Sequence, residues 1–480
     1  MVVVIISVTL ASLNEVFADD RSSYWNQNDS FVNFTHGRFV FDEANEMARR
    51  HTKFNMNALA DIAVDEVGAL HCVNIEKCSD GLYNKSSILT MDCGRQVVAK
   101  VRDPNAGLPY YTTASEVATM HFVRDVFGTP APQVYASNAN VEGNLVGAEY
   151  IIMEKVRGIQ LRFVWARLHA LDKAKIVYAI ARHQRQWSLV SFRQFGSLYY
   201  AKDVEDEGLG DWDSVLDYRM AVGHREIAAI KSSPHLPKQM AMLSGSGIYE
   251  PSAAEKLSAL QSYLNIIKYL LPTDSAISAS HLWHNDLHDE NIFVGPSNPT
   301  KITGIIDWQG IQLAPLFDHT LQPAFLNYDG PEVEGLEQPA LPDNLDALPA
   351  TERRAAIKLY HDSSLVGASR ILTHKKSEPL YRALEFQNSH SAYLLLIFRN
   401  LFEIGEAQFR WNILTLEDRW ADLPGVRALE NPAFPLSFSA AECEEIETDV
   451  NGADVGIQVM ETVREALGEF WPDKGCLGHE

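Results

Sequence analysis

The segment His281–Val294, HLWHNDLHDENIFV, concentrates three histidines, three acids and two asparagines in fourteen residues. Asp286 and Asn291 stand five apart in it, directly before the apolar run IFV. A turn sequence, GPSNP, and a second apolar run, ITGII, lead on to Asp307. The two runs predict a β-hairpin centred near Pro299, in which Ile292 pairs with Ile306 and Asn291 meets Asp307 at the open end.

This hairpin predicts a Mg²⁺ site, because a neutral oxygen ligand and two carboxylates would lie together and Mg²⁺ prefers a few protein oxygens plus phosphates and water. The spacing D-x-x-x-x-N followed by a metal-binding Asp is that of a kinase catalytic loop. Asp286 would then orient an acceptor hydroxyl and take its proton, while Asn291 and Asp307 hold the metal. An acidic hairpin mouth with Asn and Asp as turn formers is the alternative.

Phosphoryl transfer of this kind also needs a strand lysine on the phosphates and a helical glutamate that holds it. VVAKV supplies Lys100 on a strand whose Val97, Ala99 and Val101 face the other way. Glu116 lies in the first turn of the following predicted helix, which we expect to end at Gly128. Thr113 and Glu116 also form a capping-box pattern, so two roles compete for one carboxylate.

The loop SDGLYNKS, residues 79–86, lies between two predicted strands, where a phosphate-covering loop belongs. Gly81 is its single glycine, and Asn84, Lys85 and Ser86 offer polar groups that could compensate. An ordinary hairpin turn is the alternative.

IIMEKV, residues 151–156, predicts the connection between two lobes. There the backbone groups of Glu154 and Val156 would be available to an adenine ring, and the alternative is a plain buried strand end.

Along the chain, short strand patterns and one helix up to about residue 158 give way to amphipathic helices with three- and four-residue apolar spacing. The sequence therefore predicts an α+β fold with a small β-rich lobe and a larger helical lobe. We expect a poorly defined leader at 1–33, a nucleotide-binding lobe at 34–156 with a preceding helical extension, and a helical lobe at 157–480 with the catalytic loop and substrate site. An acidic loop at 202–214 and a Pro-rich loop at 329–349 are expected to be solvated.

HNDLHDENIFV resembles the H-x-D-L-H-x-x-N-I-x-V signature of the aminoglycoside phosphotransferase and choline kinase branch of the protein-kinase-like fold, and GIIDW resembles its second metal-binding motif. More narrowly, GLYNKSSILTM, DPNAG, YTTASEVATM and GAEYIIMEKVRG are similar to the fungal altered-inheritance-of-mitochondria family. The likeness runs from about Phe34 into the C-terminal helical region and is specific from Gly81 to Trp308.

The resemblance implies a bilobal fold, ATP and Mg²⁺ as cofactors, and transfer of the γ-phosphoryl group to a hydroxyl of a small molecule. It carries Asp286 over as catalytic, Asn291 and Asp307 as metal ligands, and Lys100 with Glu116 as the phosphate-anchoring pair. His284 and His288 match positions that brace the loop. Trp-Gln-Gly follows Asp307 in place of Phe-Gly, and no A-P-E follows. Ordinary protein-kinase activity is therefore not expected.

The composition limits the kinds of molecule that this protein is expected to bind and the compartment in which it is expected to fold. A formal net charge of −22 argues against nucleic acid, whose recognition needs a basic surface. No segment after the N-terminus is apolar for long enough to span a membrane. Five sparse cysteines without a C-x-x-C pair indicate no disulfide framework and a reducing compartment.

Localisation is less clear from the N-terminus. MVVVIISVTLASLNEVFADD has no positive charge before its apolar run and lacks the Arg-rich character of a presequence. The narrower family implies a mitochondrial location, and a cytoplasmic one is the alternative. Three N-glycosylation sequons occur, at Asn28, Asn33 and Asn84. They would favour secretion, but a glycan at Asn84 would obstruct the predicted phosphate loop. We therefore do not expect the protein to be secreted.

Two alternative functions remain open. A catalytically weak or inactive kinase-like protein with a role in mitochondrial maintenance would keep the fold and ATP binding. A metal-dependent hydrolase could use His284 and His288, at the i, i+4 spacing of a helical zinc pair, together with Asp307. The motif is not H-E-x-x-H, however, and it leads into a strand.

Overall fold

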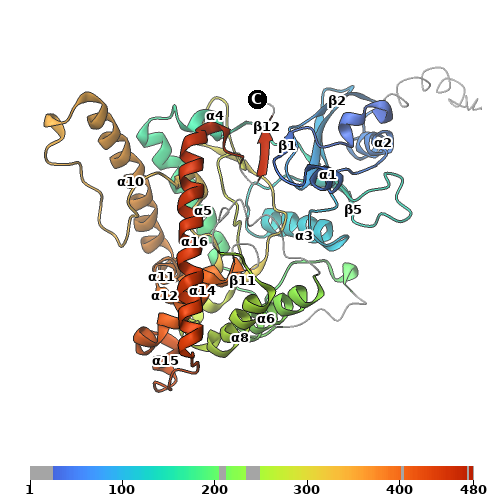
Figure 1. Cartoon of the computed structure of the whole chain (residues 1–480). Helices are drawn as coiled ribbons and strands as arrows, with labels where there is room; N and C mark the ends of the chain where they lie inside the picture. The colour runs from blue at the N-terminus through green and yellow to red at the C-terminus, as the bar shows by residue number, and fades with distance from the viewer. Residues whose placement is uncertain (1–24, 205–211, 234–248, 402–404, 473–474, 479–480) are drawn as a thin grey trace, which may run out of the picture. The chain divides into compact units, whose positions relative to one another are not determined.

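The computed structural model describes residues 25–204, 212–233, 249–401, 405–472 and 475–478. The expected leader up to residue 24 and residues 205–211 of the expected acidic loop lie outside this part. Most strand residues lie in the first third of the chain and most helices in the rest (Figure 1), and the predicted α+β class is confirmed.

The described residues fall into two compact units. Unit 1 holds the chain up to Arg124, then Ala131–Val156, and the residues from Cys476 onward; unit 2 holds Asp125–Pro130 and Arg157–Gly475. The main division thus falls between Val156 and Arg157. Two assignments differ from the predicted lobes. Residues 125–130 belong to unit 2, and the strand that begins at Cys476 belongs to unit 1.

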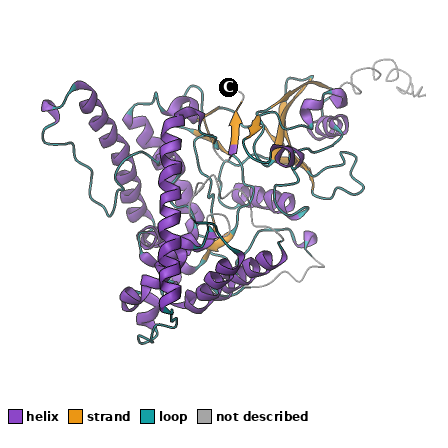
Figure 2. Cartoon of the chain, in the orientation of Figure 1, coloured by secondary structure: helices purple, strands orange, loops and turns teal. Residues whose placement is uncertain are grey.

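Strands are concentrated in unit 1 (Figure 2). Its strands are β1 (Gly37–Phe39), β2 (Cys72–Lys77), β3 (Asn84–Met91), β4 (Gln96–Arg102), β5 (Val134–Asn138), β6 (Tyr150–Glu154) and β12 (Cys476–Gly478). Its helices are η2 (Trp25–Gln27), η3 (Asp29–Phe31), α1 (Glu43–Ala48), α2 (Met56–Val67) and α3 (Tyr111–Asp125).

An antiparallel sheet of five strands in the order β2-β3-β4-β6-β5 forms the frame of unit 1. β3 alternates between buried and partly buried residues, as a strand with one core face should. On β4, Val97, Ala99 and Val101 are buried in the core with Leu59 of α2, which confirms the face predicted for them. Lys100 therefore projects from the opposite face of the strand.

The ends of the chain pair in unit 1. β1 and β12 form an antiparallel pair in which Gly37 lies opposite Gly478. A Cβ at Gly37 would lie 2.0 Å from the carbonyl oxygen of Leu477, so only glycine permits this close approach. A two-stranded pair is weak alone, and the neighbouring contacts of residues 30–52 described below hold this region together.

Helices dominate unit 2 (Figure 2). Its α-helices are α4 (Arg162–Trp165), α5 (Ala170–Ser188), α6 (Val215–Ser232), α8 (Ala253–Leu270), α9 (Ser275–Ser278), α10 (Ala350–Lys376), α11 (Glu378–Gln387), α12 (His390–Arg399), α14 (Ala407–Leu414), α15 (Pro424–Ala428) and α16 (Ala440–Leu467). Its 3-10 helices are η4 (Ala201–Asp203), η5 (Leu316–Asp318), η6 (Ala324–Leu326), η7 (Leu345–Ala347), η8 (Thr415–Asp422) and η9 (Gly468–Phe470).

Short strands within unit 2 carry the predicted catalytic segment. They are β7 (Ile159–Gln160), β8 (Ser280–Leu282), β9 (Ile292–Val294), β10 (Ile302–Ile305) and β11 (Leu313–Pro315). β10, β9 and β7 form one small antiparallel sheet, and β11 pairs with β8. Gly158 makes the approach of β7 possible: its φ is +137°, and a Cβ there would lie 2.4 Å from the carbonyl oxygen of Val294.

Three fully buried tryptophans form the core beneath these strands. Trp187 of α5 meets Trp283 and Trp308 edge to face, with ring centroids 5.3 and 5.9 Å apart. Its indole N–H donates to the hydroxyl of Thr129 at 2.9 Å. This contact explains why residues 125–130 belong to unit 2 although the sequence assigns them to the preceding lobe.

No helix in the described ranges has the length and apolarity needed to cross a membrane. All five cysteines are free thiols.

Candidate active site

Lys100 and Glu116 form a buried ion pair in unit 1. The Nζ of Lys100 lies 2.7 and 2.9 Å from the two carboxylate oxygens of Glu116, so the contact is bidentate. Both side chains are more than 90% buried. The pairing predicted between strand and helix is confirmed, while its role on nucleotide phosphates stays a prediction.

The capping role proposed for Thr113 is wrong. α3 begins at Tyr111, so Thr113 lies inside the helix and not before it. Its hydroxyl donates to the carboxylate of Glu149 at 2.6 Å, which also receives the N–H of Tyr110 and an ion pair from Arg102. Because Thr113 is not at the N-cap position, the capping box does not form, and the carboxylate of Glu116 binds Lys100. The helix itself ends at Asp125, three residues before Gly128, whose φ is +64°.

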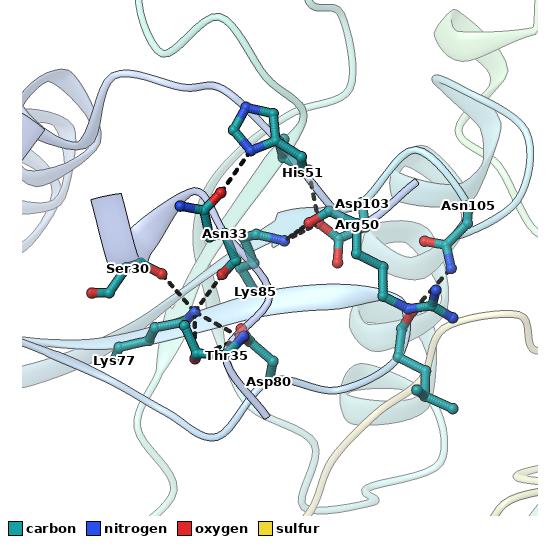
Figure 3. Close-up of polar contacts among 12 residues, drawn as sticks. Ser30, Asn33, Thr35, Arg50, His51, Lys77, Asp80, Lys85, Asp103 and Asn105 are labelled. Carbon is teal, nitrogen blue, oxygen red and sulfur yellow. Dashed lines mark hydrogen bonds and ion pairs between the residues drawn. The ribbon is translucent and has the colours of Figure 1, made fainter. Parts of the chain in front are cut away.

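The loop between β2 and β3, residues 78–83, is the predicted phosphate-covering loop, and side chains fasten it at both ends (Figure 3). Asp80 is buried, and its carboxylate accepts from Lys77 at 2.6 Å and from the N–H and hydroxyl of Thr35. The carbonyl of Leu82 accepts from Arg50 and from Asn105, each at 3.0 Å. The glycine-poor loop is therefore held in one shape by its neighbours.

Gly81 lies exposed at the centre of this loop. A Cβ there would meet nothing closer than the carbonyl oxygen of Asn84, at 4.0 Å, so space does not require a glycine. Asn84 begins β3 and pairs with Arg102 of β4. Gly81 thus lies in the loop and Asn84 at the start of the strand that follows it. Their contact with phosphates stays a prediction.

Lys85 does not supply the compensating charge that the sequence suggested. Its Nζ donates to the carboxylate of Asp103 at 2.5 Å and to the carbonyl of Arg50, and it is almost completely buried (Figure 3). Thr52 donates to the same carboxylate oxygen at 2.7 Å. Burial raises the pKa of Asp103, and the bond and charge of Lys85 oppose that rise. Lys85 is a structural residue.

Glu154 ends β6, and Val156 is the last residue of unit 1 before the division of the chain. The backbone N–H of Glu154 donates to the carbonyl of Gln133 at 2.7 Å, and its carboxylate forms a half-exposed ion pair with Arg124. That amide is therefore already bonded, and a contribution of Glu154 to an adenine ring would come from its carbonyl.

Asp286 lies in the loop between β8 and β9, with 69% of its side chain exposed. Two donors fold the loop around its backbone carbonyl: the N–H of His288 at 3.1 Å and the Nδ2 of Asn291 at 2.9 Å. The loop thus keeps the carboxylate of Asp286 turned outward. An exposed, positioned carboxylate can accept a proton from a hydroxyl.

Asn291 is buried, and its amide orientation follows from its bonds. Because Nδ2 donates to the carbonyl of Asp286, Oδ1 is the atom that Asn291 can turn toward a cation. The carbonyl of Asn291 accepts from the N–H of Ile306 at 2.9 Å. This bond joins the end of the catalytic loop to the strand that leads to Asp307.

The predicted hairpin is present, but its register differs by one residue. Ile292 pairs with Ile305, not with Ile306, and a bulge lies between Ile302 and Gly304. Val294 pairs with Ile302, so the hairpin is centred at Asn298 and not at Pro299. The bulge adds one residue to β10 and thereby brings the partner of Ile292 to within one residue of the prediction. Asn291 consequently lies opposite Ile306, one residue before Asp307.

Asp307 has a φ of +61°, in the left-handed region that non-glycine residues seldom adopt. Trp308, fully buried and bonded through its indole N–H to the carbonyl of Ile305 at 2.9 Å, fixes the chain immediately after it. Strained residues of this kind cluster at functional sites. The tryptophan at the position that Phe occupies in protein kinases is thus an anchor for an exposed carboxylate.

His284 braces the loop, as the resemblance implied. It is fully buried, and its Nε2 donates to the carbonyl of Ile306 at 2.8 Å. Burial lowers the pKa of His284. His288 also braces the loop, because its Nδ1 accepts the N–H of Glu290 at 3.2 Å. Its Nε2 lies 3.5 Å from the carboxylate of Asp286, which raises the pKa of His288.

These contacts disfavour the zinc hydrolase. β9 begins at Ile292, so His284 and His288 lie in a loop and not on a helix. Among the described residues, the one group of three acids, histidines or cysteines close enough to share a metal ion is Glu255, Glu445 and Asp449. Arg410 forms ion pairs with all three of these carboxylates, so they already share a cationic partner.

Sequence reasoning missed the support behind the loop. Asn285 accepts the N–H of Thr320 at 3.0 Å through Oδ1. His319 donates from Nε2 to the carbonyl of His281 at 2.9 Å, and burial lowers the pKa of His319 to about 3. The polar dipeptide Asp318-His319 could have indicated this support, because it follows an apolar run and buried polar residues need hydrogen-bond partners.

A sequence model of the phosphotransferase enzyme family matches residues 74–318, just over half of the chain. The chain belongs to this family. The matched region contains both the Lys100–Glu116 pair and the loop of Asp286. Its fold is the α+β fold of kinase-like phosphotransferases.

Fungal proteins are among its relatives. A subtelomeric hrmA-associated cluster protein of Aspergillus fumigatus is 33% identical over 343 residues, which cover 59% of this chain and 66% of that protein. The match therefore spans slightly less than two thirds of that relative's length. Altered inheritance of mitochondria protein 9, mitochondrial, of Lachancea thermotolerans is 24% identical over 432 residues, covering 68% of this chain and 69% of the relative.

Solved structures with similar folds share little sequence. A candidate aminoglycoside phosphotransferase of Ralstonia eutropha has 13% identity and a TM-score of 0.42, with 85% of this chain and 99% of that chain covered. The ADP-bound aminoglycoside phosphotransferase APH(2'')-Ib has 13% identity and a TM-score of 0.36, with 73% and 99% covered.

Proposed function

We propose that this chain is an ATP-dependent phosphotransferase that transfers the γ-phosphoryl group to a hydroxyl of a small molecule. The bidentate Lys100–Glu116 pair carries the proposal furthest. A buried lysine held by a helical glutamate costs desolvation and contributes little net stability. Family membership, the exposed carboxylate of Asp286 and solved relatives with bound nucleotides support the same activity.

The chain's own residues would act as follows. Glu116 holds the ammonium of Lys100 in place through both carboxylate oxygens, so that the lysine can bind phosphate oxygens. Asp286, fixed through its backbone carbonyl, orients the acceptor hydroxyl and accepts its proton on a carboxylate oxygen. His284 keeps this loop in register with the strand before Asp307. Positioning and charge are the main contributions that such an enzyme makes to phosphoryl transfer.

The donor set fits Mg²⁺. Asn291 can offer its amide oxygen because its nitrogen is bonded to Asp286, and Asp307 offers an exposed carboxylate on a fixed backbone. Both are hard oxygen donors, which Mg²⁺ prefers. When bound with nucleotide, the ion would neutralise charge on the phosphates.

The test is a screen of a metabolite library for ATP-dependent phosphorylation, with Asp286→Ala as the control. We expect Asp286→Ala to lower turnover by at least about a hundredfold while Mg·ATP still raises the melting temperature. Full activity in Asp286→Ala on an identified acceptor would show that the assignment is wrong.

A kinase-like binding protein with little or no turnover is the second candidate. The single glycine of the β2–β3 loop and the burial of Lys85 favour it, because both reduce what the loop can offer to phosphates. A melting-temperature shift with Mg·ATP, combined with no product from any acceptor, would support this candidate over the first.

We also propose a mitochondrial location, which rests on the relatives that bear mitochondrial names. A small-molecule acceptor, and not nucleic acid, is the expected partner, on the grounds of charge. Fractionation of cells that express the full-length natural protein tests the location; recovery in the cytosolic fraction alone would contradict it.

A further inference from the structure

A groove of about 400 Å³ lies between α5 and α10, two helices of unit 2 that pack against each other (Figure 1). Both helices contribute to its walls. The lining residues are Tyr178, Ala181, Arg182, Arg185, Gln186, Leu372, Lys375 and Lys376. The volume is large enough for a small organic ligand.

The charge of the groove is opposite to that of the chain. Four of its lining residues are cations, and none is an acid. The chain has 63 acidic and 41 basic side chains and a net charge of −22, so a groove lined by cations alone is unusual for it. Within the described ranges, none of the four cations forms an ion pair with an acid.

Capping of the C-terminus of α10 explains the position of three of these four cations. The Nε of Arg185 donates to the carbonyl of Lys376 at 3.1 Å, at the last turn of α10. Arg185 and the two lysines thereby balance the partial negative charge of a helix C-terminus. Arg182, however, lies nearly one turn earlier on α5 and has no helix end to cap.

The groove lies on a different face of α5 from the catalytic loop. Trp187 and Gln184 are buried, and they bond to Thr129 and to the carbonyl of Leu321. At 100° per residue, Arg182 and Gln186 point to the opposite side of the helix. A ligand in the groove would therefore not occupy the site of Asp286.

We propose that this groove is a second binding site, for a ligand that carries two or more phosphate groups. One guanidinium group can bind two oxygens of a phosphate at once, and a lysine adds a single positive charge. Two arginines and two lysines therefore match a diphosphate or a ring that carries several phosphates. Arg185 is already oriented by its bond to α10. The exposed ring of Tyr178 supplies an apolar wall at the same groove. The ligand is either a soluble organic phosphate or the headgroup of an anionic lipid.

The test compares two charge-reversal variants of the full chain. Arg182→Glu/Lys375→Glu places two acids in the groove, one from each helix. Arg353→Glu/Arg354→Glu makes the same change in net charge on exposed residues of α10, at the other end of the helix. Equal circular dichroism spectra and melting temperatures of the two variants will show that both are folded.

Calorimetric titration with pyrophosphate and with inositol hexakisphosphate measures the soluble arm. We expect the groove variant to bind at least about tenfold more weakly than the wild type, whereas the α10 control stays within about twofold. Lys100→Met should keep this binding, which separates the groove from the predicted nucleotide site. Binding to the wild type should also weaken with added salt.

Flotation with phosphatidylcholine vesicles that do or do not contain phosphatidylinositol 4,5-bisphosphate measures the lipid arm. Loss of flotation in the groove variant, without soluble binding in the wild type, assigns the site to a lipid headgroup. Loss of soluble binding in the groove variant assigns it to a free phosphate ligand. Equal behaviour of wild type, groove variant and control in both arms overturns the proposal.

Discussion

Two buried lysine–carboxylate pairs lie on neighbouring strands of unit 1, and they differ in what surrounds them. Lys85 of β3 binds Asp103, and Lys100 of β4 binds Glu116. The first pair is enclosed by further partners, since Arg50 offers a carbonyl to Lys85 and Thr52 a hydroxyl to Asp103. In the second pair, β4 contributes Lys100 and α3 contributes Glu116, which holds the ammonium through both of its carboxylate oxygens.

The difference shows that burial of a lysine does not by itself indicate a ligand site. The enclosed pair fastens the N-terminal segment to the sheet, because the carbonyl of Arg50 and the hydroxyl of Thr52 both bond to it; Figure 3 shows Lys85, Asp103 and Arg50 together. The bidentate pair joins β4 to α3, and its role on nucleotide phosphates stays a prediction. Substitutions can separate the two roles.

The largest expected effect is on stability, at Lys85. Lys85→Met leaves Asp103 buried without its cation, so we expect a loss of about 3–5 kcal/mol in the free energy of unfolding. Urea denaturation followed by fluorescence measures it. In the double variant Lys85→Met/Asp103→Leu most of the loss should be recovered, because no unpaired charge remains. A double variant as unstable as the single one would contradict a structural ion pair.

The matching change at Lys100 should affect binding more than folding. Lys100→Met/Glu116→Leu removes both charges, so we expect stability within about 1 kcal/mol of the wild type. Mg·ATP at a hundredfold excess over its dissociation constant stabilises the wild type by about 2.7 kcal/mol, and this shift should disappear. Thermal melting with and without Mg·ATP measures both quantities. A preserved shift would remove Lys100 from the nucleotide site.

Asp307, in unit 2, tests whether a strained backbone conformation accompanies a functional side chain. Its φ of +61° favours glycine. Asp307→Gly should therefore be as stable as the wild type or more stable, by up to about 1 kcal/mol, since relief of strain outweighs the added chain entropy. Phosphoryl transfer should be lost. The control, Asp307→Ala, removes the carboxylate and keeps the strain, so a glycine variant less stable than the alanine variant would contradict strain.

The smallest expected effect belongs to the exposed pair of His288 and Asp286. The carboxylate raises the pKa of His288 in the folded chain, so the pair stabilises below the unfolded pKa of about 6.5. This contribution is lost as the pH rises through the folded value. Both side chains are partly exposed, which limits the effect to about 0.3 kcal/mol.

Melting temperatures of wild type and His288→Gln between pH 5 and 9 will check this sign. The wild type should have a small advantage at the acidic end, and the two curves should converge at the alkaline end. An advantage that grows with pH would show that His288 stabilises in its neutral form.

Sequence patterns predicted much of the fold because they record local periodicity. The alternation of Val97, Ala99 and Val101 placed Lys100 on the other face of its strand. Helical spacing predicted α5 and α8. The spacing of Asp286, Asn291 and Asp307 predicted a hairpin, which is present with a bulge.

Other features were beyond local patterns. Glu116 could cap α3 or bind Lys100, and the sequence left both open; the helix begins at Tyr111, which places Thr113 inside it, and Glu116 binds Lys100. Lys85 looked available because its partner Asp103 lies on another segment. The pairing of β12 with β1 joins residues more than 400 positions apart, which no local pattern encodes.

The sequence by itself determined which groups this protein can use in chemistry and the order in which they occur, since residue type and spacing are properties of the chain. The tertiary structure decided which of those groups are committed to one another. Hydrogen-bonding capacity and buried charge must be satisfied in three dimensions, so the partner that each polar side chain receives depends on every segment packed around it.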